Sequence, residues 1–203
     1  HNVSSAASDV YKRQMHRMCD ELRTEYDYEM IDKWIKGETG FPFLDACMKF
    51  LQKNGWINFR MRAMIMSFAS YNMWQPWQKT SPLLAELFTD YEPGIHISQV
   101  QMQSGVTGIN LPRIYSVPKQ SIDQDINAEW TKKLLPQLND FDPKLIHNAE
   151  LEDLYIPKIV DLKASAKFAR DEIWGIRKSK VFKDEARKVY LKHGSRRKRN
   201  VNQ

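Results

Sequence analysis

The sequence predicts an all-α fold, and three observations support this prediction. Apolar residues recur at spacings of three and four in several segments, as on one face of a helix. No segment shows the sustained alternation of apolar and polar residues that a half-buried strand requires. Proline and glycine stand between the periodic segments, where helices end and turns form. With 203 residues and 42% hydrophobic residues, the chain is long enough to bury a core.

The first half of the chain predicts three helices. Residues 15–36 have a mixed three-and-four spacing that indicates one amphipathic helix, which the sequence Gly-Glu-Thr-Gly at 37–40 ends. Pro42 suits the first position of the next helix, and Gly55 suits its end. The third helix covers residues 58–74. It is expected to be buried nearly all round, because Arg62 and Ser67 are the polar residues within 61–69.

The second half predicts shorter elements. Ser81 and Pro82 are read as the N-cap and first turn of a helix over residues 83–88. The remaining segments are a short helix at 94–104, a long ordered loop at 106–125, a helix at 128–135, a turn at 143–147 and a helical stretch at 162–193 with a break near Gly175 or Ser179.

The charge is distributed unevenly. Residues 163–203 hold 14 Lys and Arg against 4 Asp and Glu, whereas the remaining residues hold 17 against 21. The sequence therefore divides into a helical domain at 15–160 and a basic C-terminal helix and tail at 161–203. Such a tail favours a polyanion such as nucleic acid, and a solvated, solubilising end explains it equally well.

Targeting signals and cysteine chemistry are not evident in the sequence. No apolar run approaches the roughly 20 residues of a membrane span, and the first residues do not resemble a secretory signal. The two cysteines, Cys19 and Cys47, form neither a disulfide framework nor a metal-ligand cluster. We therefore expect a cytoplasmic, reducing environment and no bound metal.

Residues 8–14, Ser-Asp-Val-Tyr-Lys-Arg-Gln, resemble the translation of an adapter used in transposon-based sequencing libraries. We therefore hypothesise that residues 1–14 are foreign to the protein. The nucleotide sequence tests this, since codons unlike the adapter would exclude it.

Arg62 is the first residue that indicates a site. A charge on so apolar a helix needs a partner or a route to solvent, because an isolated buried ion is costly. Asp90 and Glu92 are the candidate partners. An Arg–Asp pair that joins two helices and a charged pair that lines a pocket remain equal alternatives. Arg60 lies about 200° away around the helix, so it is expected to face elsewhere and to contact phosphate.

Isolated residues give weaker signals. His96 by itself indicates a hydrogen-bonded loop histidine more strongly than a catalytic one. Trp74 and Trp77, three residues apart, are expected on one helix face in the core, and Trp56 is expected to anchor the core. Phosphate-binding glycine loops, dinucleotide turns and nucleophile elbows do not occur in the sequence.

Taken in order, two segments resemble the flavin-binding domain of the photolyase/cryptochrome family. Residues 34–48, from Trp34 through Thr39-Gly40 to Asp45-Ala-Cys-Met, are followed by Gly55-Trp56-Ile-Asn-Phe-Arg-Met-Arg62. The resemblance covers about residues 34–160. It continues through Trp77, Asp90-Tyr91-Glu92, Arg113-Ile-Tyr and Leu135-Pro-Gln-Leu.

This resemblance implies an all-helical domain around FAD. It implies that Arg62 pairs with Asp90 beside the flavin ring, that Glu92 lines the same pocket and that His96 lies next to flavin N5. It also implies light-driven electron transfer from reduced flavin to ultraviolet-damaged pyrimidines that are flipped out of DNA. The cofactor-binding residues that we expect are Phe59, Arg62, Asp90, Tyr91, Glu92 and His96. The residues that we expect at DNA are Arg60 and Met102.

Departures from the family pattern argue for a divergent branch. Phe59 stands where the family has an Asn that contacts flavin and lesion. Val100 and Met102 stand where photolyases often have two tryptophans, the first of which begins the relay that photoreduces the flavin. Trp77 keeps its place in that relay, and Trp74 is the other electron-transfer candidate. Met102 would offer a softer surface to a lesion.

The resemblance does not include the family's N-terminal α/β domain or the phosphate loop and Glu-bearing helix of the flavin domain. We therefore expect half a flavin site and weak or no FAD binding by this chain. Three hypotheses follow: a photolyase-like DNA repair enzyme, a cryptochrome-type blue-light or redox signalling flavoprotein, and a helical DNA-binding module with a degenerate pocket. The protein is expected to be a monomer without a membrane anchor. Upstream sequence separates the third hypothesis from the others, and a repair assay separates the first two.

Overall fold

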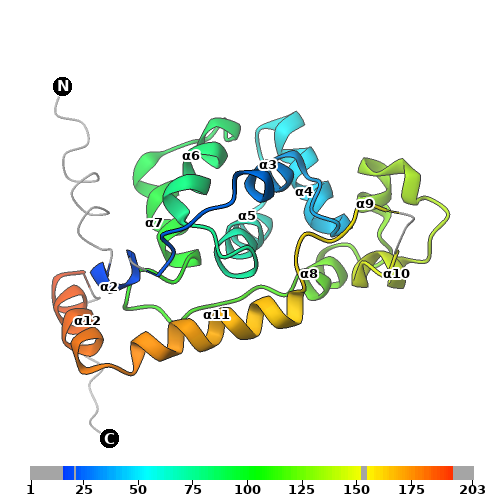
Figure 1. The fold of residues 1–203 in the computed structure, drawn as a ribbon. Coiled ribbons are helices and arrows are strands. Elements are labelled where there is room, and N and C mark those ends of the chain that lie inside the picture. Colours follow the sequence, from blue (N-terminus) through cyan, green and yellow to red (C-terminus); the bar gives the residue numbers. More distant parts are fainter. Residues whose placement is uncertain (1–15, 21, 152–154, 194–203) are drawn as a thin grey trace, which may run out of the picture.

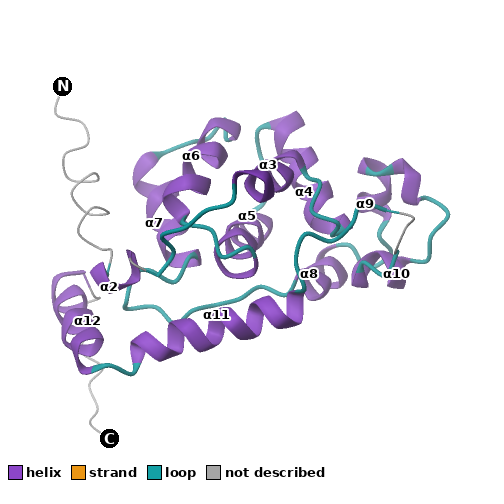
Figure 2. Ribbon diagram, in the orientation of Figure 1, coloured by secondary structure: helices purple, strands orange, loops and turns teal. Residues whose placement is uncertain are grey.

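The chain folds into helices joined by loops, in a computed structural model that describes residues 16–20, 22–151 and 155–193. None of these residues forms a strand, as Figure 2 shows, which confirms the predicted fold class. Within these ranges no helix is both long and apolar enough to cross a membrane. The hypothesis about residues 1–14 concerns a segment outside the described residues, so it stays a prediction.

The helices are arranged as a body with one group at each end (Figure 1). The first half of the chain contains α2 Arg17–Asp20, α3 Tyr28–Lys36, α4 Pro42–Asn54, α5 Phe59–Ser67, the π-helix η1 Phe68–Asn72, α6 Trp77–Leu87 and α7 Pro93–Gln103. The second half contains α8 Val117–Gln124, α9 Glu129–Leu134, the 3-10 helix η2 Pro136–Leu138, α10 Pro143–Asn148, α11 Leu162–Arg177 and α12 Lys180–His193. Helices α3 to α7 form the body, and α11 runs along it from the α8–α10 group to α12.

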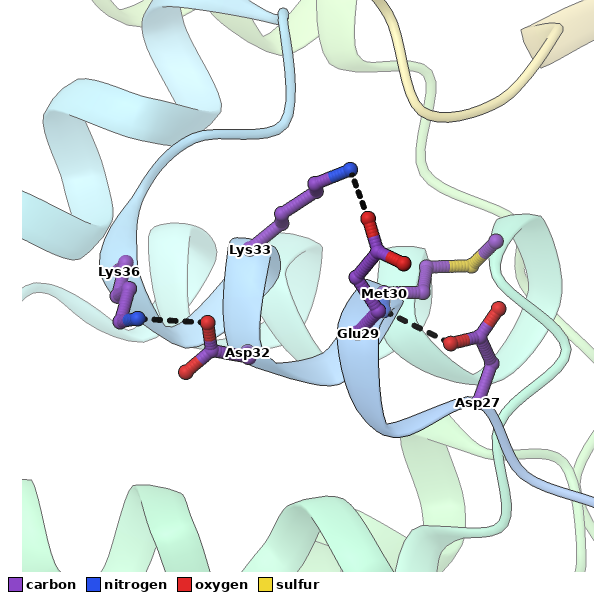
Figure 3. Close-up of polar contacts among 6 residues, drawn as sticks. All are labelled: Asp27, Glu29, Met30, Asp32, Lys33 and Lys36. Carbon is purple, nitrogen blue, oxygen red and sulfur yellow. Dashed lines mark hydrogen bonds and ion pairs between the residues drawn. The ribbon is translucent and has the colours of Figure 1, made fainter.

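The start of α3 corrects the single helix that was predicted for residues 15–36. The structure has two helices there, α2 and α3, with residues 22–27 outside any helix. Asp27 begins α3, since its extended backbone ends the preceding segment and its carboxylate accepts from the Met30 N–H at 3.0 Å (Figure 3). Two exposed ion pairs follow along the helix, Lys33–Glu29 at 2.7 Å and Lys36–Asp32 at 2.6 Å.

The predicted helix at 58–74 ends earlier than expected. It consists of α5 and then the π-helix η1, and it is buried from Ala63 to Asn72. Trp74 lies beyond it in a left-handed conformation with φ of 56°, whereas Trp77 opens α6. The expectation that Trp74 and Trp77 share one helix face is therefore wrong.

Helix α6 begins at Trp77, five residues before Pro82, which was predicted to lie in its first turn. Pro82 lies inside the helix, where its missing N–H removes one helical hydrogen bond. The Ser81 side chain does not cap α6 and instead lies 3.1 Å from the His96 ring nitrogen Nε2. The prediction of an N-cap at Ser81 is therefore wrong, and this position belongs to the site described below.

The predictions for the second half were mostly confirmed. Helix α7 matches the predicted segment 94–104, and α9 matches 128–135. The long loop at 106–125 is wrong in its last part, since Ser116 caps α8 there and accepts from the Lys119 N–H. The break in the C-terminal stretch falls at residues 178–179, while Gly175 lies within α11.

The main hydrophobic core lies around α4 and α5. Its largest fully buried side chains include Trp34, Phe43, Phe68 and Leu44, all at 1% exposure or less. Trp56 does not anchor this core, as was expected, because 51% of its surface is exposed. It follows Gly55, the end of α4, and its side chain lies on the surface near Arg62.

A tight turn at residues 37–45, which we call the signature turn, links α3 to α4. The buried Asp45 carboxylate accepts four hydrogen bonds: from the Thr39 N–H at 2.8 Å, the Thr39 hydroxyl at 2.6 Å, the Gly40 N–H at 3.1 Å and the Tyr155 hydroxyl at 2.9 Å. Gly40 has φ of 82°, and a Cβ there would lie 2.6 Å from the Lys158 Cα. The turn therefore needs glycine at this position.

Candidate functional site

A pocket of about 150 Å³ lies between α5, α6 and α7. All six residues predicted to bind a cofactor line it, and they come from the start of α5, from the loop before α7 and from α7 itself. The lining residues are Phe59, Arg62, Ala63, Ile65, Met66, Leu84, Phe88, Asp90, Tyr91, Glu92, Ile95, His96, Gln99, Val100 and Gln103. The first half of α7 and the loop before it thus form one wall of a pocket.

Helix periodicity explains which residues of α7 reach the pocket. His96, Gln99, Val100 and Gln103 follow the spacing i, i+3, i+4, i+7, so they share one face of the helix. Met102 lies six residues after His96, about 240° around the helix, and it does not line the pocket. Met102 was expected at the DNA and not at the cofactor, and that expectation stays a prediction.

The predicted contact between Arg62 and Asp90 is confirmed. The Arg62 Nη2 lies 2.9 Å from an Asp90 carboxylate oxygen, and its Nε donates to the Ile57 carbonyl at 2.7 Å. The guanidinium lies over the Phe88 ring, 4.2 Å from its centre. Arg62 holds the pKa of Asp90 below its usual value through this hydrogen bond.

The pair is less buried than the apolar helix predicted. The side chain of Arg62 is 26% exposed and that of Asp90 is 48% exposed. The reason is that Arg62 lies in the first turn of α5, which is open to solvent, whereas the buried part begins at Ala63. The loop that carries Asp90 is held there by the Thr89 N–H, which donates to the Gly55 carbonyl at 2.9 Å.

Glu92 and Tyr91 have distinct positions at the pocket. The Glu92 carboxylate caps α7 by accepting from the Ile95 N–H at 2.7 Å. This local bond gives Glu92 a structural role in addition to lining the pocket. The Tyr91 ring is 43% exposed and lies 5.3 Å from the His96 ring, edge to face.

His96 is fixed to α6. Its Nε2 lies 3.1 Å from both the Ser81 carbonyl oxygen and the Ser81 hydroxyl. Its ring also packs edge to face against Phe88 at 5.9 Å. Burial, with a contribution from the charge of Arg62, lowers the pKa of His96.

Three other candidate residues lie away from the pocket. Trp77 is partly buried and packs against the core. Trp74 packs edge to face against Phe168 of α11 at 5.1 Å, with the Arg23 guanidinium 4.3 Å from its ring centre. Arg60 is exposed, as its expected orientation requires. None of the three lines the pocket.

Sequence reasoning missed several residues of the site. Gln99 and Gln103 line the pocket, and the buried Gln99 Oε1 has no hydrogen-bond partner among the described residues. The i, i+3, i+4, i+7 pattern from His96 could have identified both. Ser81 had no such signal, because its contact depends on how α6 packs against α7.

Comparisons with known proteins agree with this arrangement. A model of the family described as the FAD-binding domain of DNA photolyase matches residues 1–175. A deoxyribodipyrimidine photo-lyase of Alkalihalophilus pseudofirmus is 29% identical over 141 residues, covering 68% of this chain and 29% of that protein. A cryptochrome DASH of Solanum lycopersicum is 31% identical over 140 residues, covering 68% of this chain and 24% of that protein.

The fold is also similar to solved structures. A crystal structure of an archaeal photolyase from Sulfolobus tokodaii with two FAD molecules matches with a TM-score of 0.76 at 24% identity, over 82% of this chain and 40% of that one. The chain spans less than a third of the curated relatives described above. It belongs to the FAD-binding-domain family of DNA photolyase, whose cofactor is FAD.

Proposed function

We propose that the pocket between α5, α6 and α7 binds the flavin ring of FAD and that the whole protein is a photolyase-like enzyme that repairs ultraviolet-damaged pyrimidines in DNA. One observation carries the proposal. Six side chains assigned to the cofactor by the family resemblance line one pocket, with the Arg62–Asp90 ion pair among them. These residues are up to 37 positions apart in the sequence, and a superficial resemblance would not predict that they line the same pocket.

The chemistry of the lining fits a flavin ring. Most of the lining side chains are apolar or aromatic, as a ring of this kind requires, and a few polar groups converge among them. Gln99 supplies a buried acceptor without a partner among the described residues, which a ring N–H could satisfy. Arg62 supplies a fixed positive charge that favours negative charge on a neighbouring group.

The pocket would hold part of the cofactor. Its volume of about 150 Å³ lies below the roughly 300–1,000 Å³ of sites that enclose an organic ligand. Phe59, Tyr91 and Ile95 line it and yet are 58%, 43% and 65% exposed. We therefore propose that these residues form one side of the FAD site and that this chain alone binds FAD weakly.

Each polar residue has a separate task in this proposal. When bound, FAD supplies light-driven electron transfer. Arg62 and Asp90 orient the ring edge and set the charge beside it. Gln99 and His96 offer hydrogen-bonding atoms to the ring, and Phe88 and Val100 keep water from that side of the pocket.

The proposal includes DNA as the partner of the whole protein. Arg60 is exposed in the same first turn of α5 as Arg62, so it could contact a phosphate while Arg62 faces the pocket. We also propose that the whole protein acts as a monomer in the cytoplasm. The two cysteines of the sequence do not make the disulfide framework that is usual in an oxidising compartment.

Nuclear magnetic resonance of the 203-residue chain tests the cofactor site. FAD at millimolar concentration is expected to shift the amide resonances of Tyr91, Ile95 and His96 while leaving those of α11 unchanged. Arg62→Ala should weaken this binding, and the matched variant Arg60→Ala should leave it intact. Shifts confined to other helices would contradict the proposed site.

A cryptochrome-type signalling flavoprotein is the second candidate, and one observation favours it. Val100 is 4% exposed, lines the pocket and belongs to the core against which Trp77 packs. An aliphatic side chain therefore stands on the pocket side, where it cannot carry a hole toward Trp77. A route from the pocket through Trp77 or Trp74 would need a tyrosine or tryptophan beside the flavin, and Tyr91 is the residue of either kind that lines the pocket.

Repair activity separates the two functions. The protein encoded by the complete gene, chemically reduced to bypass photoreduction, is illuminated with DNA that contains pyrimidine photoproducts. Restoration of the pyrimidines supports the enzyme. Bound, reduced FAD without any repair supports the signalling function instead.

A further inference from the structure

We infer that the backbone carbonyl of Ser81 fixes His96 in the tautomer that carries its proton on Nε2. His96 then presents Nδ1 as a hydrogen-bond acceptor, so the pocket selects a ligand atom that bears hydrogen. This inference rests on the proposed function where it names the ligand as a flavin. Its structural part, the tautomer of His96, stands on the geometry alone.

The two contacts of Nε2 are not equivalent. The Ser81 carbonyl oxygen, 3.1 Å away, accepts hydrogen bonds and cannot donate them. The Ser81 hydroxyl, also 3.1 Å away, can do either. A proton on Nε2 satisfies both contacts at once, whereas a lone pair on Nε2 would face the carbonyl lone pairs. The carbonyl therefore decides the tautomer, and the hydroxyl adapts to it.

The surroundings keep this geometry rigid. Ser81 is 1% exposed and lies inside α6, so its carbonyl cannot move independently of the helix. The His96 ring packs edge to face against both Phe88 and Tyr91, at 5.9 and 5.3 Å between ring centres. With Nε2 bound to α6, Nδ1 is the ring nitrogen left for a ligand, since it bonds to none of the described residues.

The charge of His96 follows from its neighbours. The titratable and charged groups that line the same pocket are Arg62, Asp90, Tyr91 and Glu92. Asp90 is already paired with Arg62, and Glu92 caps α7, so neither carboxylate is bonded to the imidazole. Burial and the positive charge of Arg62 disfavour the imidazolium. His96 is therefore neutral near pH 7, and Nδ1 carries a lone pair.

The family resemblance implies that His96 lies next to flavin N5, and an acceptor there would distinguish the redox states of the flavin. The central ring nitrogen N5 of an oxidised flavin is an acceptor, whereas the same atom in the reduced ring bears hydrogen. Two acceptors repel one another, and a donor and an acceptor form a hydrogen bond. We therefore expect the pocket to bind reduced FAD about fivefold more tightly than oxidised FAD, the effect of one net hydrogen bond.

Nitrogen NMR of the 203-residue chain, with ¹⁵N-labelled histidine, reads the tautomer directly. The His96 resonances are identified as those missing from the spectrum of His96→Phe. At pH 7.5 we expect them to show a protonated Nε2 and an unprotonated Nδ1. Ser81→Ala should leave the tautomer unchanged, because the carbonyl remains. A proton on Nδ1, or a mixture of both tautomers, would overturn the inference.

Titration with oxidised FAD and with dithionite-reduced FAD tests the selection. Wild-type protein should prefer reduced FAD, and His96→Phe should bind both states equally. Equal binding by the wild type, with FAD clearly bound, overturns the selection and leaves the proposed flavin site standing. If neither state binds the 203-residue chain at millimolar concentration, the titration is repeated with the protein encoded by the complete gene. Absence of binding there overturns the proposed flavin site, and the tautomer measurement still decides the structural part.

Discussion

Two aspartates from the family-like segments, Asp45 in the signature turn and Asp90 at the pocket, have opposite surroundings. Asp45 is buried and accepts four hydrogen bonds from groups within the protein. Asp90 is about half exposed, and Arg62 is the side chain that bonds to it. Burial raises the pKa of Asp45, whereas the hydrogen bond from Arg62 lowers the pKa of Asp90.

The difference separates a structural residue from one available to a ligand. The oxygens of Asp45 are fully used in closing the turn between α3 and α4 and in attaching residue 155 to it. Asp90 keeps unused accepting capacity at the edge of a pocket. A sequence pattern treats both aspartates alike, while their hydrogen bonds assign them different tasks.

Replacing each aspartate by asparagine should show the largest difference between the two regions. Asp45→Asn turns two acceptor oxygens into one acceptor and one donor against four buried donors, so we expect a loss of about 3 kcal/mol or more in the free energy of unfolding. Asp90→Asn breaks a partly exposed pair and should cost less than about 1 kcal/mol. Urea denaturation followed by circular dichroism measures both. Equal losses would contradict the distinction.

Gly40→Ala tests the backbone of the signature turn. The positive φ and the 2.6 Å approach of a Cβ to the Lys158 backbone predict a loss of about 2–4 kcal/mol, from strain and overpacking together. Gly175→Ala is the matched control, because a Cβ there meets no atom within 4 Å, and alanine favours the interior of α11. This control should be neutral or slightly stabilising in the same denaturation experiment.

Tyr155→Phe removes one of the four donors to Asp45. The carboxylate keeps the other three, so we expect a smaller loss, about 1.5–3 kcal/mol. In the Asp45→Asn background the same change should cost much less, since the two groups interact directly. Additive losses would show that the hydroxyl of Tyr155 acts independently of Asp45.

The smallest effect is expected from His96, in the dependence of stability on pH below about 6.5. Because its pKa in the folded protein is lowered from 6.5, the folded state binds this proton less readily than the unfolded chain. Stability should therefore fall as the pH drops below about 6.5, and this contribution should be absent above it. His96→Gln should flatten that part of the profile in thermal melts. An unchanged slope would show that His96 does not contribute.

The helical class and the residues that meet at the pocket were predicted from the sequence better than the element boundaries. A charge on an apolar helix needs a partner, which left Asp90 and Glu92 as candidates for Arg62, and the family resemblance selected Asp90. The predicted start of α6 was wrong because Pro82 lies inside the helix, whereas proline most often marks the first turn of a helix. The predicted burial of Trp56 was wrong because the position of an aromatic residue after a glycine does not indicate whether its side chain faces the core or the solvent.

Contacts between distant segments were the least predictable part of the site. The bond from His96 to Ser81 and the attachment of Tyr155 to Asp45 join residues 15 and 110 positions apart. Neither has a local pattern, because each depends on how whole elements pack. Gln99 and Gln103 were predictable in principle, since they follow from His96 by helix periodicity.

The FAD affinities of the wild type and two arginine variants test whether the flavin site is built on Arg62 and Asp90. Fluorescence titration of the wild type, Arg62→Ala and Arg60→Ala, each checked for folding by circular dichroism, compares two arginines in the same turn of α5. We expect Arg62→Ala to weaken FAD binding about tenfold or more, equivalent to about 1.4 kcal/mol, and Arg60→Ala to leave it within a factor of two. Equal affinities for all three proteins would contradict a flavin site built on Arg62 and Asp90.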